Sequence, residues 1–149
     1  MKPTMLHPRG ATLLCDLILD RIKDLGNIEY IGGLEIGAVP LLAPLSMRAE
    51  TAGRHLPGFF VRKEVKNHGT RRLIEGVTQD ELQGKRVLIL DDVTTTGGSA
   101  HLAVEAAQTA GANVVLVLSI VDREEGAVEF FKQKGIPFAS LFVASEFLN

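Results

Sequence analysis

Two adjacent carboxylates, followed by hydroxyl and glycine residues, form the stretch of this chain that is best suited to chemistry. Asp91 and Asp92 follow the apolar run 87–90, and residues 93–99 read Val-Thr-Thr-Thr-Gly-Gly-Ser. Each carboxylate can accept a charge-assisted hydrogen bond from one of the two vicinal hydroxyls of a ribose. Glycines and short hydroxyl side chains before a helix N-terminus provide donors for a phosphate. The stretch therefore predicts a cradle for a ribose 5-phosphate.

The elements around this stretch follow from its pattern. The unbroken apolar run 87–90 is typical of a parallel strand covered on both faces, and we expect it to end where the carboxylates begin. Apolar spacing predicts a helix over 100–110. The loop between them lacks the Gly-Lys-Ser/Thr of a P-loop and the G-x-G-x-x-G spacing of a dinucleotide site. An ordinary turn capped by two aspartates is the plain alternative, but such a turn needs neither so many hydroxyls nor two glycines.

Residues 87–99 resemble the thirteen-residue motif with which type I phosphoribosyltransferases bind 5-phosphoribosyl 1-diphosphate (PRPP). The resemblance implies that the two aspartates bind the ribose hydroxyls and act in catalysis, by stabilising positive charge on the ribose. It implies that the following loop holds the 5′-phosphate. The residues so assigned to PRPP are Asp91, Asp92, Val93, Thr94, Thr95, Thr96, Gly97, Gly98 and Ser99.

A second candidate lies in the basic stretch 54–72, which has six basic residues and one acidic residue in a chain of net charge −2. Residues 62–72 have no apolar period, so we expect a surface loop that can close over an anionic ligand. His68 has a suitable intrinsic pKa for a general acid, or it serves only as a hydrogen-bond donor. A solvated lysine-rich loop is the alternative.

The sequence Arg-Lys-Glu-Val-Lys-Asn-His-Gly in this loop resembles the catalytic loop of the orotate phosphoribosyltransferase family. In that family the loop crosses a dimer interface. The resemblance implies that Arg62 and Lys63 bind pyrophosphate in their own subunit. It implies that Lys66 and His68 are catalytic and contact PRPP in the partner subunit of a homodimer.

Two further segments resemble parts of the same family. Residues 32–40 form a second strand, glycine loop and helix start, and resemble the pyrophosphate loop, in which backbone amides, one of them beside a strained or cis peptide, meet the leaving group. That loop comprises Leu34, Glu35, Ile36 and Gly37. Some members have a lysine at the position of Ile36. A purely structural glycine turn is the alternative.

The orotate side of the site rests on fewer residues. Asp122-Arg123 resembles the Asp-Arg-x-Glu segment of the family, which implies that Arg123 binds the base, with Thr95 bonding its carboxylate. The alternative for Arg123 is a surface arginine paired with Glu124 or Glu125.

Strand and helix patterns alternate along the chain and predict an α/β fold with a mostly parallel central sheet flanked by helices, the type I phosphoribosyltransferase fold that the resemblance implies. After an irregular lead-in over 1–8, the expected helices are 9–25, 39–52, 100–110, 124–134 and 144–148. The expected strands are 28–33, 56–62, 73–77, 87–90, 114–122 and 138–143.

Composition places the chain among globular proteins. It has 149 residues, 46% apolar and 23% charged, with no apolar run long enough to span a bilayer and no signal-peptide pattern. We expect a cytoplasmic protein that binds neither membrane nor nucleic acid. The single cysteine, Cys15, excludes an internal disulfide framework.

Members of the family begin with an additional segment that forms a hood over the orotate site and carries Ser-Gly-x-x-Ser-Pro-Tyr. This sequence begins with Met-Lys-Pro-Thr and has no such stretch. We expect a single core domain, 1–149, without the hood, either because the chain is shortened or because its gene starts further upstream.

Together the motifs predict the transfer of phosphoribose from PRPP to orotate, which gives orotidine 5′-phosphate and pyrophosphate. The sequence has no cluster of metal ligands, so we expect Mg²⁺ to be held mainly by oxygens of PRPP. Two alternatives stay open. One is a phosphoribosyltransferase for another nucleobase, although such enzymes use different loops. The other is a non-catalytic regulator that senses PRPP or nucleotides.

Overall fold

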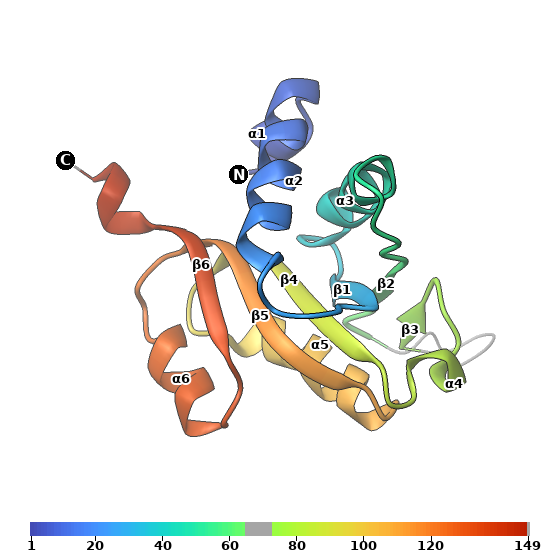
Figure 1. The fold of residues 1–149 in the computed structure, drawn as a ribbon. Helices are drawn as coiled ribbons and strands as arrows, with labels where there is room; N and C mark the ends of the chain where they lie inside the picture. Colours follow the sequence, from blue (N-terminus) through green and yellow to red (C-terminus); the bar gives the residue numbers. More distant parts are fainter. Residues whose placement is uncertain (65–72, 149) are drawn as a thin grey trace.

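A computed structural model describes residues 1–64 and 73–148 of the chain. Its centre is a six-stranded sheet in the order β3-β2-β1-β4-β5-β6 (Figure 1). All neighbouring strands are parallel except β2 and β3, which are antiparallel. The strands are β1 (Tyr30–Leu34), β2 (Gly58–Val61), β3 (Ile74–Glu75), β4 (Arg86–Thr94), β5 (Asn113–Asp122) and β6 (Phe138–Val143). The expected mostly parallel α/β fold is confirmed.

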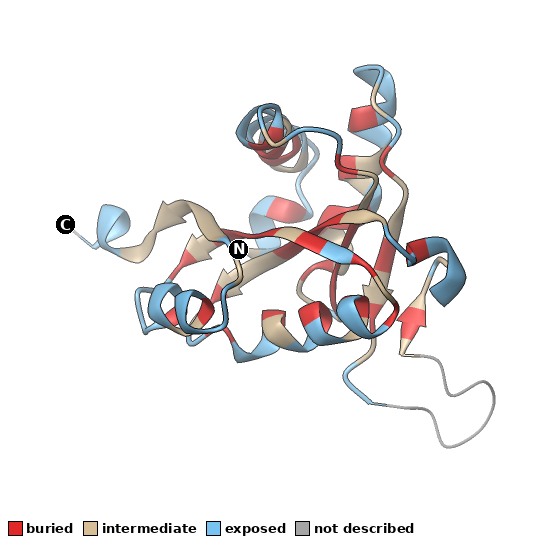
Figure 2. Ribbon diagram, turned by 60° about the horizontal axis from the view of Figure 1, so that its bottom comes forward, coloured by how far each residue is buried: buried red, intermediate tan, exposed pale blue. Residues whose placement is uncertain are grey.

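Helices cover both faces of the sheet, and two apolar cores result. The helices are α1 (Lys2–Met5), α2 (Pro8–Ile22), α3 (Val39–Thr51), α4 (Gln79–Leu82), α5 (Gly98–Thr109) and α6 (Ala127–Gln133), and a 3₁₀ helix, η1 (Ala144–Phe147), follows β6. One core joins α2 and α3 to the sheet, and the other joins α5 and α6 to the opposite face. Figure 2 shows the buried residues along the strands and on the inner sides of these helices.

The position of strand β4 between two cores explains why residues 87–90 are all apolar. Leu88 and Leu90 contribute to the core under α2 and α3, whereas Val87 and Ile89 contribute to the core over α5. Successive side chains of a strand point to opposite faces, so a strand covered on both sides needs apolar residues at every position. Each fully buried side chain of this kind contributes about 1.5–3 kcal/mol to stability.

Strands β2 and β3 form a hairpin that holds together the described residues on the two sides of segment 65–72. Phe60 pairs with Glu75 and Val61 with Ile74, and the N–H of Arg62 donates to the Leu73 carbonyl at 2.8 Å. The expected short strand over 73–77 is therefore present as β3. The hairpin brings Arg62 and Leu73 together at the carboxyl end of β2.

Several boundaries differ from those that the sequence predicts. Residues 1–8 are not irregular, because Lys2–Met5 forms a helical turn that buries Met5. Strand β4 does not end before the carboxylates but continues to Thr94, since its pairing with β5 continues to Asp122. The helix expected from 124 begins only at Ala127, because two residues before it have positive φ angles, Glu124 and Gly126.

Helix α4 was not predicted, although the sequence carries a signal for it. Thr78 accepts a hydrogen bond from the N–H of Glu81, and the Glu81 carboxylate accepts from the N–H of Thr78 at 2.6 Å. This reciprocal capping box fits the Thr-x-x-Glu spacing. The helix leads the chain from the hairpin to β4.

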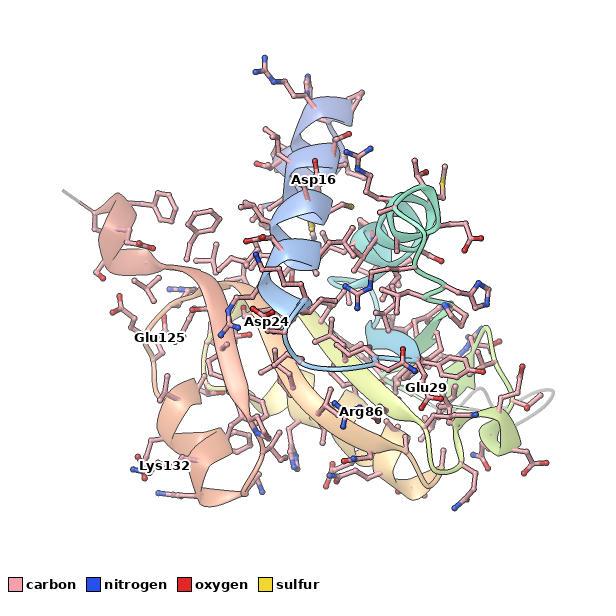
Figure 3. The ribbon with its side chains drawn as sticks, in the orientation of Figure 1. Asp16, Asp24, Glu29, Arg86, Glu125 and Lys132 are labelled. Carbon is pink, nitrogen blue, oxygen red and sulfur yellow. The ribbon has the colours of Figure 1, made fainter. Side chains whose placement is uncertain are left out.

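Arg86 holds the amino ends of β1 and β4. These ends lie at the sheet edge opposite the predicted loops. The guanidinium of Arg86 donates to the carbonyls of Asn27 and Leu25, at 2.9 and 2.6 Å, and its N–H donates to the carboxylate of Glu29 at 2.9 Å. Arg86 and Glu29 are both labelled in Figure 3. These bonds fix the two central strands relative to each other before they reach the site.

Gly33 gives a testable measure of how tightly β1 is packed. A Cβ atom there would collide with Ala38 and would lie 2.6 Å from the Leu90 carbonyl oxygen. Overpacking of this kind costs about 1–3 kcal/mol. We expect Gly33→Ala to lower the free energy of unfolding in urea by about that amount.

The matched control is Gly58→Ala, on the neighbouring strand, where the nearest atom to an added Cβ is 3.7 Å away. Equal effects of the two substitutions on stability would show that the close approach at Gly33 has no energetic importance.

Candidate active site

The predicted site residues that the structure describes lie at one edge of the sheet. Strands β1, β2, β4 and β5 are parallel, so their carboxyl ends lie at the same edge. These ends are followed by the pyrophosphate loop after β1, by Arg62 and Lys63 after β2, by the loop 95–99 after β4, and by Arg123 after β5. Lys66 and His68 lie outside the described residues.

The two carboxylates contact different parts of the site. Asp91 accepts a hydrogen bond from the Thr94 hydroxyl at 2.7 Å. Asp92 lies against the pyrophosphate loop, since a Cβ atom on Gly37 would be 2.5 Å from its Oδ1. A side chain at position 37 would displace the Asp92 carboxylate from its place in this structure. The ribose motif and the pyrophosphate loop are thus in direct contact, although they are far apart in the sequence.

Burial raises the pKa of Asp91 above the ordinary value of an aspartate. The hydrogen bond from Thr94 acts in the opposite direction and lowers the pKa, because it favours the ionised carboxylate, and the charge of Asp92 adds a smaller increase. Thr94 is almost completely buried, at 1% exposed. In this structure its hydroxyl therefore supports Asp91, and a phosphate contact of Thr94 stays a prediction.

The role of Thr94 predicts a change in pH dependence. In Thr94→Val the carboxylate of Asp91 loses its donor, so its pKa rises further and it binds a proton at a higher pH than in the wild type. A protonated Asp91 is a poorer acceptor for a ribose hydroxyl. We expect the acid limb of PRPP affinity, measured by calorimetry over a pH series, to move to higher pH.

Thr94→Ser is the control, because it keeps the hydroxyl. It is expected to follow the wild-type pH profile, and a profile of Thr94→Val that also overlays the wild type would rule out this function of the hydroxyl.

The loop after β4 has the geometry of a phosphate site. Gly97 has a φ of 96°, and a Cβ atom there would lie 2.8 and 2.9 Å from the rings of Phe130 and Phe131. Helix α5 begins at the next residue, Gly98. The first N–H of the helix that donates to a backbone carbonyl is that of His101, which donates to the Gly97 carbonyl. The N–H groups before His101 in the first turn are thus available to an anion.

The side chains around this loop leave space for a ligand. A Cβ atom on Gly98 would meet nothing closer than the Thr96 hydroxyl, at 3.9 Å. Thr96, Gly98 and Ser99 are exposed, and Val93 and Thr95 are partly buried. The predicted phosphate-binding loop is therefore open to ligand at the residues that follow Thr94.

The pyrophosphate loop contains a cis peptide between Glu35 and Ile36, as the resemblance implies for this loop. Ile36 is 68% exposed. The carboxylate of Glu35 does not face away from the protein but accepts a hydrogen bond from the N–H of Lys63 at 2.9 Å. Lys63, in the basic stretch, is thus attached to the pyrophosphate loop.

Two predicted cationic residues are engaged in ion pairs. The Arg62 Nε donates to Glu75 at 2.8 Å, and its side chain is only 22% exposed. Arg123 pairs with Glu125, labelled in Figure 3, at 2.8 Å, while its N–H donates to the Thr94 carbonyl at 2.9 Å. The pair of Arg123 is exposed, and exposed pairs contribute little energy, so a ligand can compete for this guanidinium.

Sequence reasoning missed three contributors to the site. Glu75 holds Arg62, and Phe130 and Phe131 support Gly97 from α6. Nothing in the local spacing marks these contacts, because each joins separate elements. The Asp-x-x-Thr spacing of Asp91 and Thr94 was visible, but the density of threonines concealed which hydroxyl supports the carboxylate.

The described residues, 1–64 and 73–148, include no group of three or more His, Cys, Asp or Glu side chains placed to hold a metal ion. Within the same residues no helix is long and apolar enough to cross a membrane. Asp91 and Asp92 provide oxygen ligands of the kind that Mg²⁺ prefers, but too few to complete its coordination. The residues therefore fit a cation that arrives with its ligand's own oxygens.

A mostly parallel sheet with two adjacent carboxylates near the carboxyl end of a central strand, a glycine loop after that strand and a second loop in contact with Asp92 is the arrangement typical of type I phosphoribosyltransferases. The model for the phosphoribosyl transferase domain matches residues 6–135. Over 150 aligned residues the chain is 56% identical to an orotate phosphoribosyltransferase of Bradyrhizobium diazoefficiens, covering 100% of this chain and 80% of that protein.

More distant relatives agree. An orotate phosphoribosyltransferase of Sorangium cellulosum is 41% identical, with 99% of this chain and 76% of that protein aligned. The crystal structure of the Mycobacterium tuberculosis orotate phosphoribosyltransferase in complex with PRPP matches with a TM-score of 0.82 and 33% identity, covering 97% of this chain and 80% of that one. The chain therefore belongs to the orotate phosphoribosyltransferase family.

Proposed function

We propose that the chain transfers the phosphoribosyl group of PRPP to orotate, giving orotidine 5′-phosphate and pyrophosphate in the synthesis of UMP. The observation that carries the proposal is the contact between Asp92 and Gly37, because it joins a ribose cradle to a loop for the leaving group. Similarity to a solved family member in complex with PRPP supports the same substrate. We place the reaction in the cytoplasm, without a nucleic-acid or membrane partner.

The reaction breaks the bond between ribose C1′ and a pyrophosphate oxygen and forms a bond from C1′ to a ring nitrogen of orotate, whose proton is released to the departing pyrophosphate. Positive charge develops on the ribose and negative charge on the pyrophosphate. Asp91 and Asp92 hold the two hydroxyls and stabilise the positive ribose, while backbone N–H groups of the 34–37 loop receive the leaving group. The N-terminus of α5, with the backbone of Thr95 and the hydroxyls of Thr96 and Ser99, holds the 5′-phosphate.

A Mg²⁺ ion carried by PRPP supplies neutralisation of the pyrophosphate charge. Lys63 stands next to the pyrophosphate loop and adds positive charge there. The proposed assignment of Arg62 to pyrophosphate requires this residue to leave Glu75, so we give Lys63 the larger part. Arg123 and Thr95 bind the base and its carboxylate.

We also propose a homodimer in which Lys66 and His68 act in the site of the partner subunit. The family's arrangement supports this assignment, as does the hairpin of β2 and β3, which places Arg62 and Leu73, on the two sides of the segment that carries Lys66 and His68, at the active edge.

The direct test follows orotate absorbance in the presence of PRPP and Mg²⁺, with uracil, adenine and hypoxanthine as alternative bases. We expect turnover with orotate, no turnover with the other bases, and loss of activity when a chelator removes the divalent cation. Turnover of another base would assign the chain to a different nucleobase. PRPP binding without turnover of any base would favour a sensing role.

A further inference from the structure

A carboxylate in a loop that receives pyrophosphate is unexpected, because like charges repel. Glu35 occupies such a position, and its side chain is partly buried. Its surroundings give it a different task from ligand binding. The N–H of Glu35 donates to the Val61 carbonyl at 2.8 Å, and its Oε1 accepts from the Lys63 N–H at 2.9 Å.

These two bonds reproduce the pattern of a parallel sheet. In a parallel pair, one residue donates its N–H to a carbonyl of the partner strand and accepts, through its main-chain carbonyl, from the N–H two residues further on. Glu35 donates to Val61, and its carboxylate takes the acceptor place opposite Lys63. The side chain therefore extends the ladder of β1 and β2 by one step.

The use of the side-chain carboxylate in place of the main-chain carbonyl resolves a geometric conflict. The main chain must leave β1 after Leu34 to form the pyrophosphate loop, whereas β2 must continue straight to begin the basic stretch. If the Glu35 main-chain carbonyl served Lys63, the loop would have to follow the ladder. Because the carboxylate serves Lys63, the backbone can turn while the end of β2 stays attached.

The two cations at this end of β2 are held in different ways. Arg62 is held both through its N–H, which donates to the Leu73 carbonyl, and through its side chain, which is paired with Glu75. Lys63 is fixed through its backbone, and among the described residues its ammonium forms no salt bridge. Of these two cations, Lys63 combines a backbone held beside the pyrophosphate loop with a charged side chain that has no ion pair among the described residues.

We propose that Glu35 is a positioning residue that ties Lys63 to the pyrophosphate loop, and that it acts as a hydrogen-bond acceptor and not through its charge. The inference deepens the proposed function and rests on it for the identity of the ligand. Its consequence is that pyrophosphate affinity depends on an acceptor at position 35, while the negative charge there opposes binding.

The test compares Glu35→Ala, which removes the acceptor and the charge, with Glu35→Gln, which keeps an oxygen acceptor and removes only the charge. The first measurement is amide hydrogen exchange at Lys63, which needs no substrate. A hydrogen bond that does not depend on charge is worth about 0.5–1.5 kcal/mol, so we expect exchange about 2- to 12-fold faster in Glu35→Ala. Glu35→Gln is expected to keep most of the protection.

The second measurement is titration of magnesium pyrophosphate by calorimetry, with steady-state kinetics where the wild type turns over. We expect Glu35→Ala to weaken pyrophosphate and raise the KM for PRPP about tenfold, with a smaller change in kcat. Glu35→Gln is expected to bind pyrophosphate more tightly than the wild type. Glu64→Gln, an exposed charge one residue beyond Lys63, controls for the loss of a nearby carboxylate.

Opposite directions for the two Glu35 variants support the proposal. Equal losses in both would assign the effect to charge, and unchanged Lys63 exchange in Glu35→Ala would show that the tie does not hold the backbone; either result overturns the proposal. If wild type fails to turn over orotate while the exchange and pyrophosphate results stand as expected, the proposed reaction fails and the positioning role remains.

Discussion

Replacing both Asp91 and Asp92 with asparagine is expected to lower PRPP affinity by between about a hundredfold and ten-thousandfold, and to abolish turnover. Hydrogen bonds to charged groups are worth about 1.5–3 kcal/mol each, and the neutral amides lose both charge-assisted bonds to the ribose. The substitution also removes the two negative charges that stabilise positive charge on the ribose. Calorimetric titration with PRPP measures the loss.

The fold is expected to survive this change, because asparagine is isosteric with aspartate and burial already disfavours the ionised form of Asp91. Circular dichroism and urea unfolding check this point. Asp24→Asn, an exposed charge at the end of α2 and labelled in Figure 3, is the matched control and is expected to bind PRPP like wild type. Wild-type affinity in the double variant would remove the ribose-cradle assignment.

Mixing two inactive variants is expected to restore about a quarter of wild-type activity if the basic stretch acts across a dimer. One variant carries Lys66→Ala and lacks a working donated segment. The other carries Asp91→Asn with Asp92→Asn and lacks a working pocket. In a mixed dimer one site combines both lesions and the other has neither. Random exchange in equal amounts makes about half of the dimers mixed, each with one sound site of two.

The measurement is turnover after subunit exchange, compared with each variant alone, on a preparation whose wild type turns over. Lys66→Ala mixed with His68→Ala is the control, because both lesions then lie in the donated segment and no site is sound. A mixture of the first pair that gains nothing after exchange would mean that each basic segment serves its own subunit, and Lys66 and His68 would not act in trans.

The sequence by itself determined the central strand, the loop after it and the class of ligand. Apolar residues at every position of 87–90 predict burial on both faces, and two cores confirm it. Residue type and short spacing suffice here, because a strand, a turn and the first turn of a helix are local structures. The same holds for α3, predicted over 39–52 and found over Val39–Thr51.

Two predicted boundaries are wrong, because strand pairing or backbone angles that the local pattern does not show decide them. Strand β4 continues through its two carboxylates because β5 pairs with it there. The residues 91–94 by themselves do not predict that pairing. Helix α6 begins late because Glu124 and Gly126 adopt positive φ angles. Glycine favours such an angle, but a glutamate there is held by the surrounding structure.

Only the tertiary structure decided which site residues contact one another. It places Asp92 against Gly37, pairs Arg62 with Glu75, and joins Glu35 to Lys63 across 28 positions of the chain. Local sequence patterns record the periodicity of helices and strands but not the distances between elements that the sheet order brings together. The sequence therefore indicates the class of reaction, whereas the folded chain decides which charged residues are paired with each other and which stay available to a ligand.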